Sequence, residues 1–156
     1  MAEKIGIYFD EASVNGMVNF DALAQKLANK WGDTCPVVKS HPNLASDEGR
    51  KLIQADIDAG TIDGVCICGT SPRMDWDLYD FGSNVVVDRV NLREICVYAY
   101  RNPDGSELDP SAEPPELLQE MARDYINMGV VKLRNMNIPN AEELDSVKRV
   151  LVLGGG

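Results

Sequence analysis

The sequence predicts an α/β domain with three layers, in which helices cover both faces of a mostly parallel sheet of the flavodoxin-like or Rossmann-like type, and a long exit helix follows near the C-terminal end. Residues 4–9 and 64–69 form short apolar runs, which are typical of strands buried on both faces. Segments with apolar residues at helical spacing alternate with these runs. This alternation favours parallel strands joined by helices.

Local start and stop signals define the other expected elements. Asn19 and Ser46 can each cap a helix, because their side chains accept a backbone N–H of the first turn, and Gly32 and Gly60 are expected to end these helices. Pro115 opens the long helix at a position where proline is tolerated. Further strands are expected at 35–40 and 85–88, a short helix at 74–81, a helical stretch at 91–100 and an exposed loop at 102–115. The long helix is expected to end near Asn137. One face of this helix is formed by Leu118, Met121, Tyr125, Met128 and Lys132. Met121, Met128 and Met136 on this helix are interpreted as core or as a docking surface.

The charge balance limits the classes of partner. The 156 residues carry a formal net charge of −10, which argues against nucleic acid and against an anionic membrane surface as partners. No apolar run approaches the roughly 20 residues of a membrane span, so no membrane insertion is expected. The chain starts almost directly with a strand and shows no signal peptide, so a cytoplasmic location is expected.

Four cysteines, at positions 35, 66, 68 and 96, match no zinc or ferredoxin spacing. Cys66 and Cys68 are two residues apart in a strand-like segment, so their side chains are expected on the same side of the sheet. We interpret all four as buried structural thiols in a reducing compartment, with no metal bound.

Ligands of open α/β sheets bind beyond the carboxyl ends of the strands, which here selects the loops 10–18, 41–47 and 69–75. The first loop carries Asp10 and Glu11, which would repel a phosphate. His41 in the second loop has no nearby partner for catalysis and is interpreted as a solvated or capping residue. No Ser/His/Asp set and no spaced pair of glutamates is present.

The third loop offers the best candidate site. Thr70, Ser71 and Arg73 follow a strand and could form an anion cradle. Alternatively, Ser71 or Thr70 caps the next helix while Arg73 pairs with Asp75 or Asp77. The residues alone leave both interpretations open, and the structural one is favoured.

The segment Arg149 to Gly156 is an apolar run that leads into three glycines, as in the opening of a dinucleotide-binding βαβ unit. It predicts a domain at 1–137, a linker at 138–148 and, at 149–156, the truncated start of a flavin- or nicotinamide-binding domain of a longer protein. The alternative is a frayed tail that ends in a glycine linker.

Four motifs occur in order along the chain: Ser46-Asp47-Glu48-Gly49, Thr70-Ser71-Pro72-Arg73-Met74, Asn91-Leu92-Arg93-Glu94 with Cys96, and Val150-Leu151-Val152-Leu153-Gly154-Gly155-Gly156. Together they resemble the N-terminal region of the A-type subunit of heterodisulfide reductase, and the chain is also similar to the B-type subunit of the quinone-interacting membrane-bound oxidoreductase. The resemblance implies an electron-transfer oxidoreductase of sulfur metabolism with FAD and [4Fe–4S] clusters, whose FAD domain begins at Gly154, Gly155 and Gly156. It also implies other domains of the same chain and subunits of an electron-transfer complex as partners, with attachment to a membrane complex only through those subunits.

The chain departs from the resemblance at its cysteines. The family often has Cys-x-Cys-Gly after the first strand, where this chain reads Phe9-Asp10-Glu11-Ala12, and further cysteines where Ala45 and Thr70 stand. Only Cys96 keeps its thiol, and one thiolate cannot hold a cluster that normally takes four.

The chain by itself is therefore expected to bind no cofactor and to have no catalytic residues. Thr70, Ser71, Arg73, Arg93 and Cys96 are expected at an anion site or a domain interface. The rival interpretation is a stand-alone flavodoxin-like module that binds a small anion or nucleotide at Thr70 to Arg73.

Overall fold

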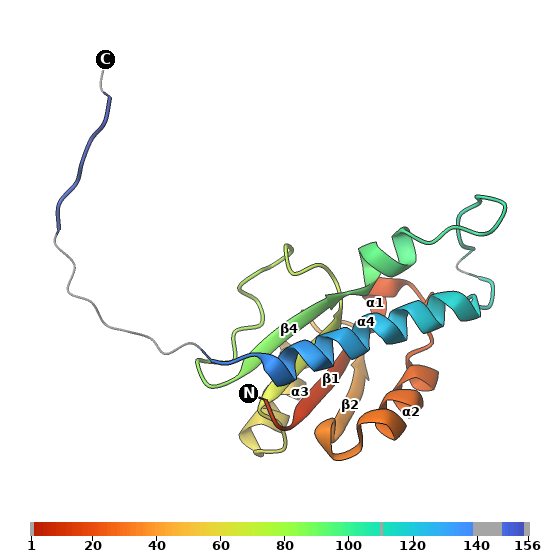
Figure 1. Ribbon diagram of the computed structural model, residues 1–156, viewed down its shortest axis with the longest axis horizontal. Helices are drawn as coiled ribbons and strands as arrows, with labels where there is room; N and C mark the ends of the chain where they lie inside the picture. The colour runs from red at the N-terminus through yellow and green to blue at the C-terminus, as the bar shows by residue number, and fades with distance from the viewer. Residues whose placement is uncertain (1, 110, 139–147, 155–156) are drawn as a thin grey trace.

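The computed structural model describes residues 2–109, 111–138 and 148–154, and these contain a parallel four-stranded sheet. Its strands are β1 (Ile5–Asp10), β2 (Val37–His41), β3 (Gly64–Gly69) and β4 (Val86–Asn91), in the order β2-β1-β3-β4 (Figure 1). β1 runs parallel to both β2 and β3, and β3 runs parallel to β4, so the carboxyl ends of all four strands lie at one edge of the sheet. The predicted α/β class is confirmed, with the strand order of flavodoxin-like sheets.

Helices and a long connection form the two outer layers. One face carries α2 (Phe20–Trp31) and α4 (Glu116–Asn135), which bury Leu23, Leu27, Ile126 and Val130, among others, against the sheet. The other face carries α3 (Asp47–Asp58) and the connection from β3 to β4, with a core that includes Tyr8, Ile53, Ile67 and Tyr79. Every residue of β1 and β3 is buried, as the apolar runs predict.

Capping signals placed the first two long helices correctly. The Asn19 side chain accepts the Ala22 N–H at 3.0 Å, and Gly32 with φ +48° ends α2. Ser46 Oγ accepts the Gly49 N–H at 3.1 Å at the start of α3. Two further short helices are the α1 turn (Glu11–Val14) and a 3₁₀ turn (Gly32–Thr34).

The expected helix at 74–81 is wrong, because this segment forms successive turns. Asp75 has φ +45°, a left-handed conformation that interrupts a helix. The carbonyls of Met74 and Asp75 both accept from Arg89, and the Asp75 carbonyl also accepts the Leu78 N–H at 3.1 Å in a single turn. The stretch at 91–100 is helical as expected, but it is a π-helix (Arg93–Tyr98), and it follows a fourth strand that ends three residues later than predicted.

The long helix exists, with Pro115 at the capping position just before it. Its buried face agrees only in part with the face predicted by the sequence. Leu118 is fully buried, and Met121 and Tyr125 pack partly buried against the core, but Met128 is 63% exposed and Lys132 is exposed. The core also receives Ala122, Ile126, Val130 and Leu133, which are all fully buried.

The position of α4 determines where a following strand can pair. The chain moves from β1 to β2 in one direction across the sheet, and α2, which joins these strands, lies on one face. It moves from β2 to β3 in the opposite direction, and α3, which joins them, lies on the other face. The two crossovers therefore have the same hand. Because α4 lies on the α2 face, a fifth strand beyond β4 would need a crossover of the opposite, disfavoured hand.

The described part of the C-terminal segment, 148–154, forms neither helix nor strand, and Val150, Leu151, Val152 and Leu153 are 77–90% exposed. Most of the predicted linker, together with Gly155 and Gly156, lies outside the described residues.

Candidate functional site at the carboxyl edge of the sheet

A hollow of about 230 Å³ lies at the carboxyl edge, where β1, β3 and the loop after β2 meet. We call it the strand-end pocket. Asp10 ends β1, Thr70 follows β3, and Asn43 and Ala45 come from the loop after β2. Its polar lining also includes Ser13, Asp75, Tyr79, Arg89 and Arg93.

Arg89 of β4 holds the loop that follows β3. Its Nη2 donates to Thr70 Oγ1 at 2.9 Å, and its Nη1 donates to the carbonyls of Met74 at 2.6 Å and Asp75 at 3.1 Å. The guanidinium also lies 5.0 Å from the centre of the Tyr79 ring. Two of its three nitrogens are therefore engaged within the protein, and the buried Nε has no partner.

Asp10 is a buried carboxylate at the end of β1, with 6% exposure. Burial raises its pKa, and this outweighs the lowering by the Leu44 N–H and by His41, Arg89 and Arg93. Its single hydrogen bond, from the Leu44 N–H, is long at 3.4 Å. A partly compensated carboxylate in this position disfavours a phosphate, in line with the sequence-based argument.

Arg93 reaches the pocket from the π-helix. Its Nε donates to the Tyr98 hydroxyl at 2.9 Å, and its guanidinium lies 5.3 Å from the centre of that ring. Arg93 also lines a second hollow together with Tyr98 and Arg101.

The structure divides the five residues that the sequence selected. Thr70 and Arg93 line the strand-end pocket. Ser71 is buried, and its Oγ accepts the Arg73 N–H at 3.2 Å, so it closes a turn and not a helix. The ion pairs among the described residues include none between Arg73 and Asp75 or Asp77. Cys96 is fully buried in the core on the α4 side, where burial raises its pKa to about 12.

Ser71 and Arg73 line a neighbouring groove of about 560 Å³ between β4 and α4, which we call the β4–α4 groove. Its apolar side includes Ile95, Tyr125 and the exposed Met128. Lys132 lies at the groove and pairs with Asp88 at 2.5 Å. The groove therefore combines accessible apolar surface with cationic side chains in an otherwise acidic chain.

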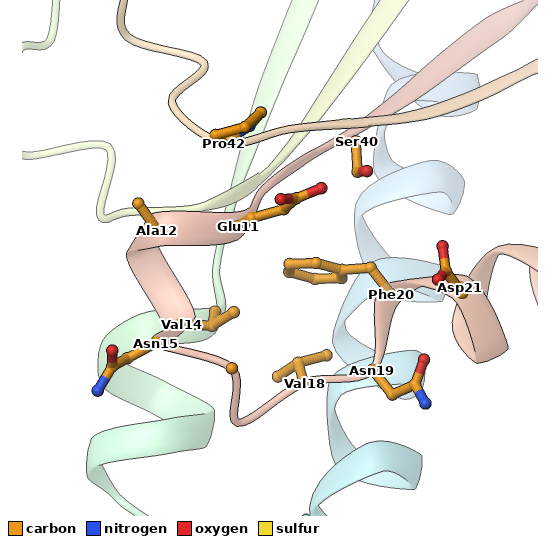
Figure 2. A pocket seen from close by; sticks show the side chains of 11 residues that line it. Glu11, Ala12, Val14, Asn15, Val18, Asn19, Phe20, Asp21, Ser40 and Pro42 are labelled. Carbon is orange, nitrogen blue, oxygen red and sulfur yellow. The ribbon is translucent and has the colours of Figure 1, made fainter. Parts of the chain in front are cut away.

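A third hollow, of about 610 Å³, lies between α1 and the start of α2. Figure 2 shows the Phe20 ring and the Glu11 carboxylate directed toward its middle, with Val14 and Val18 at its apolar side. Its ionisable lining residues are Glu11 and Asp21, both acidic, so it offers no counter-charge to a nucleotide phosphate.

The described residues contain no group of three or more His, Cys, Asp or Glu side chains that could hold a metal ion. Cys66 and Cys68 lie together under α4 with their sulfurs 3.8 Å apart, as expected for side chains on the same side of a strand. Among the helices in the described ranges, none combines the length and apolar character needed to cross a membrane.

Arg89 is the site residue that sequence reasoning missed. A charged pair, Asp88-Arg89, interrupts the apolar run of β4, and this was the available signal. The direction of each side chain depends on the register with β3, in which Ile67 is opposite Arg89.

The fold and its pockets define a parallel α/β domain with a polar hollow at the strand ends. The chain is 28% identical, over 98% of its length, to the A-type subunit of the ferredoxin/F(420)H(2)-dependent CoB-CoM heterodisulfide reductase of Methanosarcina acetivorans, and covers 19% of that protein. It is 27% identical to a protein of Archaeoglobus profundus described as similar to the A-type subunit of heterodisulfide reductase, covering 21% of it. It is 26% identical to the second iron–sulfur A-type subunit of the CoB–CoM heterodisulfide reductase of Methanopyrus kandleri, covering 23% of it.

The chain is thus a homologue of the A-type subunit of heterodisulfide reductase over nearly its whole length, and it spans about a fifth of the length of these relatives. No protein-family profile matches it. The similarity to the B-type subunit of the quinone-interacting oxidoreductase stays a prediction.

Proposed function

We propose that these residues form the N-terminal domain of an FAD- and iron–sulfur-dependent electron-transfer oxidoreductase, related to the A-type subunit of heterodisulfide reductase and active in sulfur or energy metabolism. In this protein the domain is a docking element and not a catalytic one. The observation that carries the proposal is the match of 98% of the chain to about a fifth of each relative. A cytoplasmic location, with membrane complexes reached only through partner subunits, is part of the proposal.

The exposed C-terminal segment supports a further domain. Val150 to Leu153 is apolar and 77–90% exposed, and the hand of the crossover disfavours its addition beyond β4. An apolar strand-like segment of this kind requires burial in another sheet. A dinucleotide-binding domain that starts at 149, with Gly154, Gly155 and Gly156 at its pyrophosphate turn, would supply that sheet.

The described residues do not fit an iron–sulfur cluster. Ala45 and Thr70, which stand where the resemblance places cysteines, do line the strand-end pocket, but neither supplies a thiol. Phe9, at the first cysteine position of the Cys-x-Cys-Gly motif, is buried and stacks on Phe20 with ring centres 4.4 Å apart. Cys96 lies in the core instead of at this pocket. We therefore assign no redox step to the domain.

Metal and flavin analysis tests the proposal. Residues 1–148, purified and reconstituted without oxygen, are expected to carry no iron and no flavin, whereas the full-length protein is expected to bind FAD. Flavin is not expected because Nη1 and Nη2 of Arg89 are engaged by the loop and the buried Asp10 carboxyl opposes a phosphate. Iron is not expected because Ala45 and Thr70 supply no thiol at this pocket. A stoichiometric [4Fe–4S] cluster, or tight flavin binding by residues 1–148, would contradict it, and flavin binding would favour the stand-alone module.

The docking role predicts a specific effect at the β4–α4 groove. Arg73 is exposed beside Tyr125 and Met128, so Arg73→Ala in the full-length protein should weaken its assembly with partner subunits about tenfold while flavin content stays unchanged. Lys51→Ala, an exposed cation on α3 at the opposite face, is the matched control and should have no effect. Arg93 is expected to support the same interface. Loss of flavin reduction with intact assembly would instead indicate a catalytic role for Arg73.

A further inference from the structure

The loop between β3 and β4 is fixed at both ends although it contains no helix. At its start, Arg89 bonds to Thr70 Oγ1 and to the carbonyls of Met74 and Asp75 at 2.6–3.1 Å. At its end, Tyr79 is buried in the core on the α3 side, and Leu78 and Phe81 pack against the same cluster. We call residues 70–81 the β3–β4 loop. Its backbone conformation is set by these contacts before any partner arrives.

Between the two fixed ends, the loop presents Trp76 to solvent. Trp76 is 81% exposed, and Met74 beside it is 45% exposed. The second tryptophan of the chain, Trp31, behaves differently: it is half-buried and its Nε1 donates to Asn127 Oδ1 at 2.9 Å. Tryptophan is the residue most enriched at the energetic centres of protein interfaces, and a pre-ordered loop loses little entropy on binding.

The charge of the loop restricts the partner. Asp75, Asp77 and Asp80 flank Trp76 and are exposed, and none of them takes part in an ion pair among the described residues. The Arg73 side chain lines the β4–α4 groove. Exposed carboxylates close in sequence to an exposed indole match a surface with lysines and arginines around an apolar pocket, and they oppose an anionic membrane.

We infer that the β3–β4 loop is a preformed docking element, which inserts Trp76 into an apolar pocket with a cationic rim on a partner subunit. The inference rests on the proposed assembly of the full-length protein into a complex. It adds a second contact with its own charge preference, distinct from the β4–α4 groove.

Site-specific photo-crosslinking tests the inference in the full-length protein, expressed in its own host. A benzophenone amino acid replaces Trp76, and in the matched control it replaces Leu117 on α4, which is 68% exposed. Mass spectrometry of the crosslinked peptide is expected to identify one partner segment that has apolar residues between at least two lysines or arginines. A crosslink to a second copy of the chain, to an acidic segment, or no crosslink above that from position 117 would overturn the inference.

Substitutions separate docking from folding. Trp76→Ala should reduce the partner retained by the purified full-length protein at least about tenfold, and Trp76→Phe should reduce it less. The paired change Asp75→Asn and Asp77→Asn should reduce it and weaken its dependence on salt. Arg89→Lys and Thr70→Val should also reduce the amount of partner retained, because they remove bonds that hold the loop. Circular dichroism would check that these variants are still folded. Retention unchanged by Trp76→Ala would refute the inference.

The two proposals fail in distinguishable ways. A full-length protein without flavin that still crosslinks from position 76 would refute the proposed function and leave the docking loop intact. A full-length protein that binds flavin but gives no crosslink from position 76 would refute the docking loop and leave the proposed function intact.

Discussion

Asp10 shows how one residue can influence a whole edge of the sheet. It ends the central strand β1, it is 6% exposed, and its pKa is raised by burial. A carboxyl group whose pKa is higher in the folded than in the unfolded state stabilises the fold at low pH, and this contribution is lost as the pH rises through the folded-state pKa. At pH values above the pKa of an unfolded aspartate, the buried Asp10 carboxyl therefore lowers the stability of the folded protein.

Asp10→Asn is expected to remove that destabilisation and to keep the acceptor for the Leu44 N–H. The variant should be more stable than the natural protein at pH 8 by about 1 kcal/mol, and the difference should vanish below about pH 4, near the pKa of an unfolded aspartate. Urea unfolding at both pH values measures this.

Asp104→Asn is the control of opposite sign. Hydrogen bonds from Ser106 lower the pKa of the exposed Asp104 carboxyl, so its removal should reduce stability at pH 8. If Asp10→Asn were also destabilising at pH 8, an ionised Asp10 would have a supporting role that burial does not explain.

At this scale the sequence selected five residues for one site, and the structure places two of them, Thr70 and Arg93, at the strand-end pocket. The sequence did not separate Ser71, Arg73 and Cys96 from them, because side-chain direction after a strand depends on turn geometry. Asp75 in a left-handed conformation is one such local detail.

Among the elements, α4 approaches the sheet most closely at Gly129. A Cβ at this position would lie 2.5 Å from Val90 Cγ2 and 3.2 Å from Cys66 Sγ. Glycine is therefore required here by the close packing of α4 on β3 and β4, although it is a poor helix former.

Gly129→Ala is expected to destabilise the protein by about 1–2 kcal/mol, because overpacking against Val90 exceeds the gain of about 1 kcal/mol in helix propensity. Val131→Ala, at a position 46% exposed on the same helix, should change stability by less than about 0.5 kcal/mol. Chemical denaturation of both variants provides the comparison. A stabilised Gly129→Ala variant would mean that the helix can move away from the sheet without cost.

Elements with strong local signals were predictable and the others were not. Capping residues predicted both ends of α2 and the start of α3, and continuous apolar runs predicted the buried strands β1 and β3. The face of α4 depends on how the helix rotates over the sheet. Residues such as Met121 and Ala122 are both compatible with a core, so hydrophobic spacing alone selected a partly different face.

For the whole molecule, the domain should fold without its C-terminal segment. Deletion from Lys148 onward should leave the midpoint of thermal unfolding within about 2 °C, because Val150 to Leu153 is exposed and forms no strand with the sheet. Deletion from Val130 onward should abolish cooperative unfolding, since it removes the fully buried Val130 and Leu133. Calorimetry distinguishes the two outcomes. A large fall in the midpoint for the shorter deletion would show that the segment contributes to this domain after all.

The four cysteines also make the molecule a reporter of its own local opening. All are buried, and burial raises the pKa of Cys35 and Cys96 to about 12 and that of Cys68 well above its usual value, so these three residues offer alkylating reagents almost no thiolate at neutral pH in the folded molecule. Each thiol becomes reactive only when its own region opens. Cys66 and Cys68 lie in the middle of the sheet, and Cys96 lies in the π-helix near the edge. The relative alkylation rates at these positions would thus give a residue-resolved map of unfolding without any engineered label.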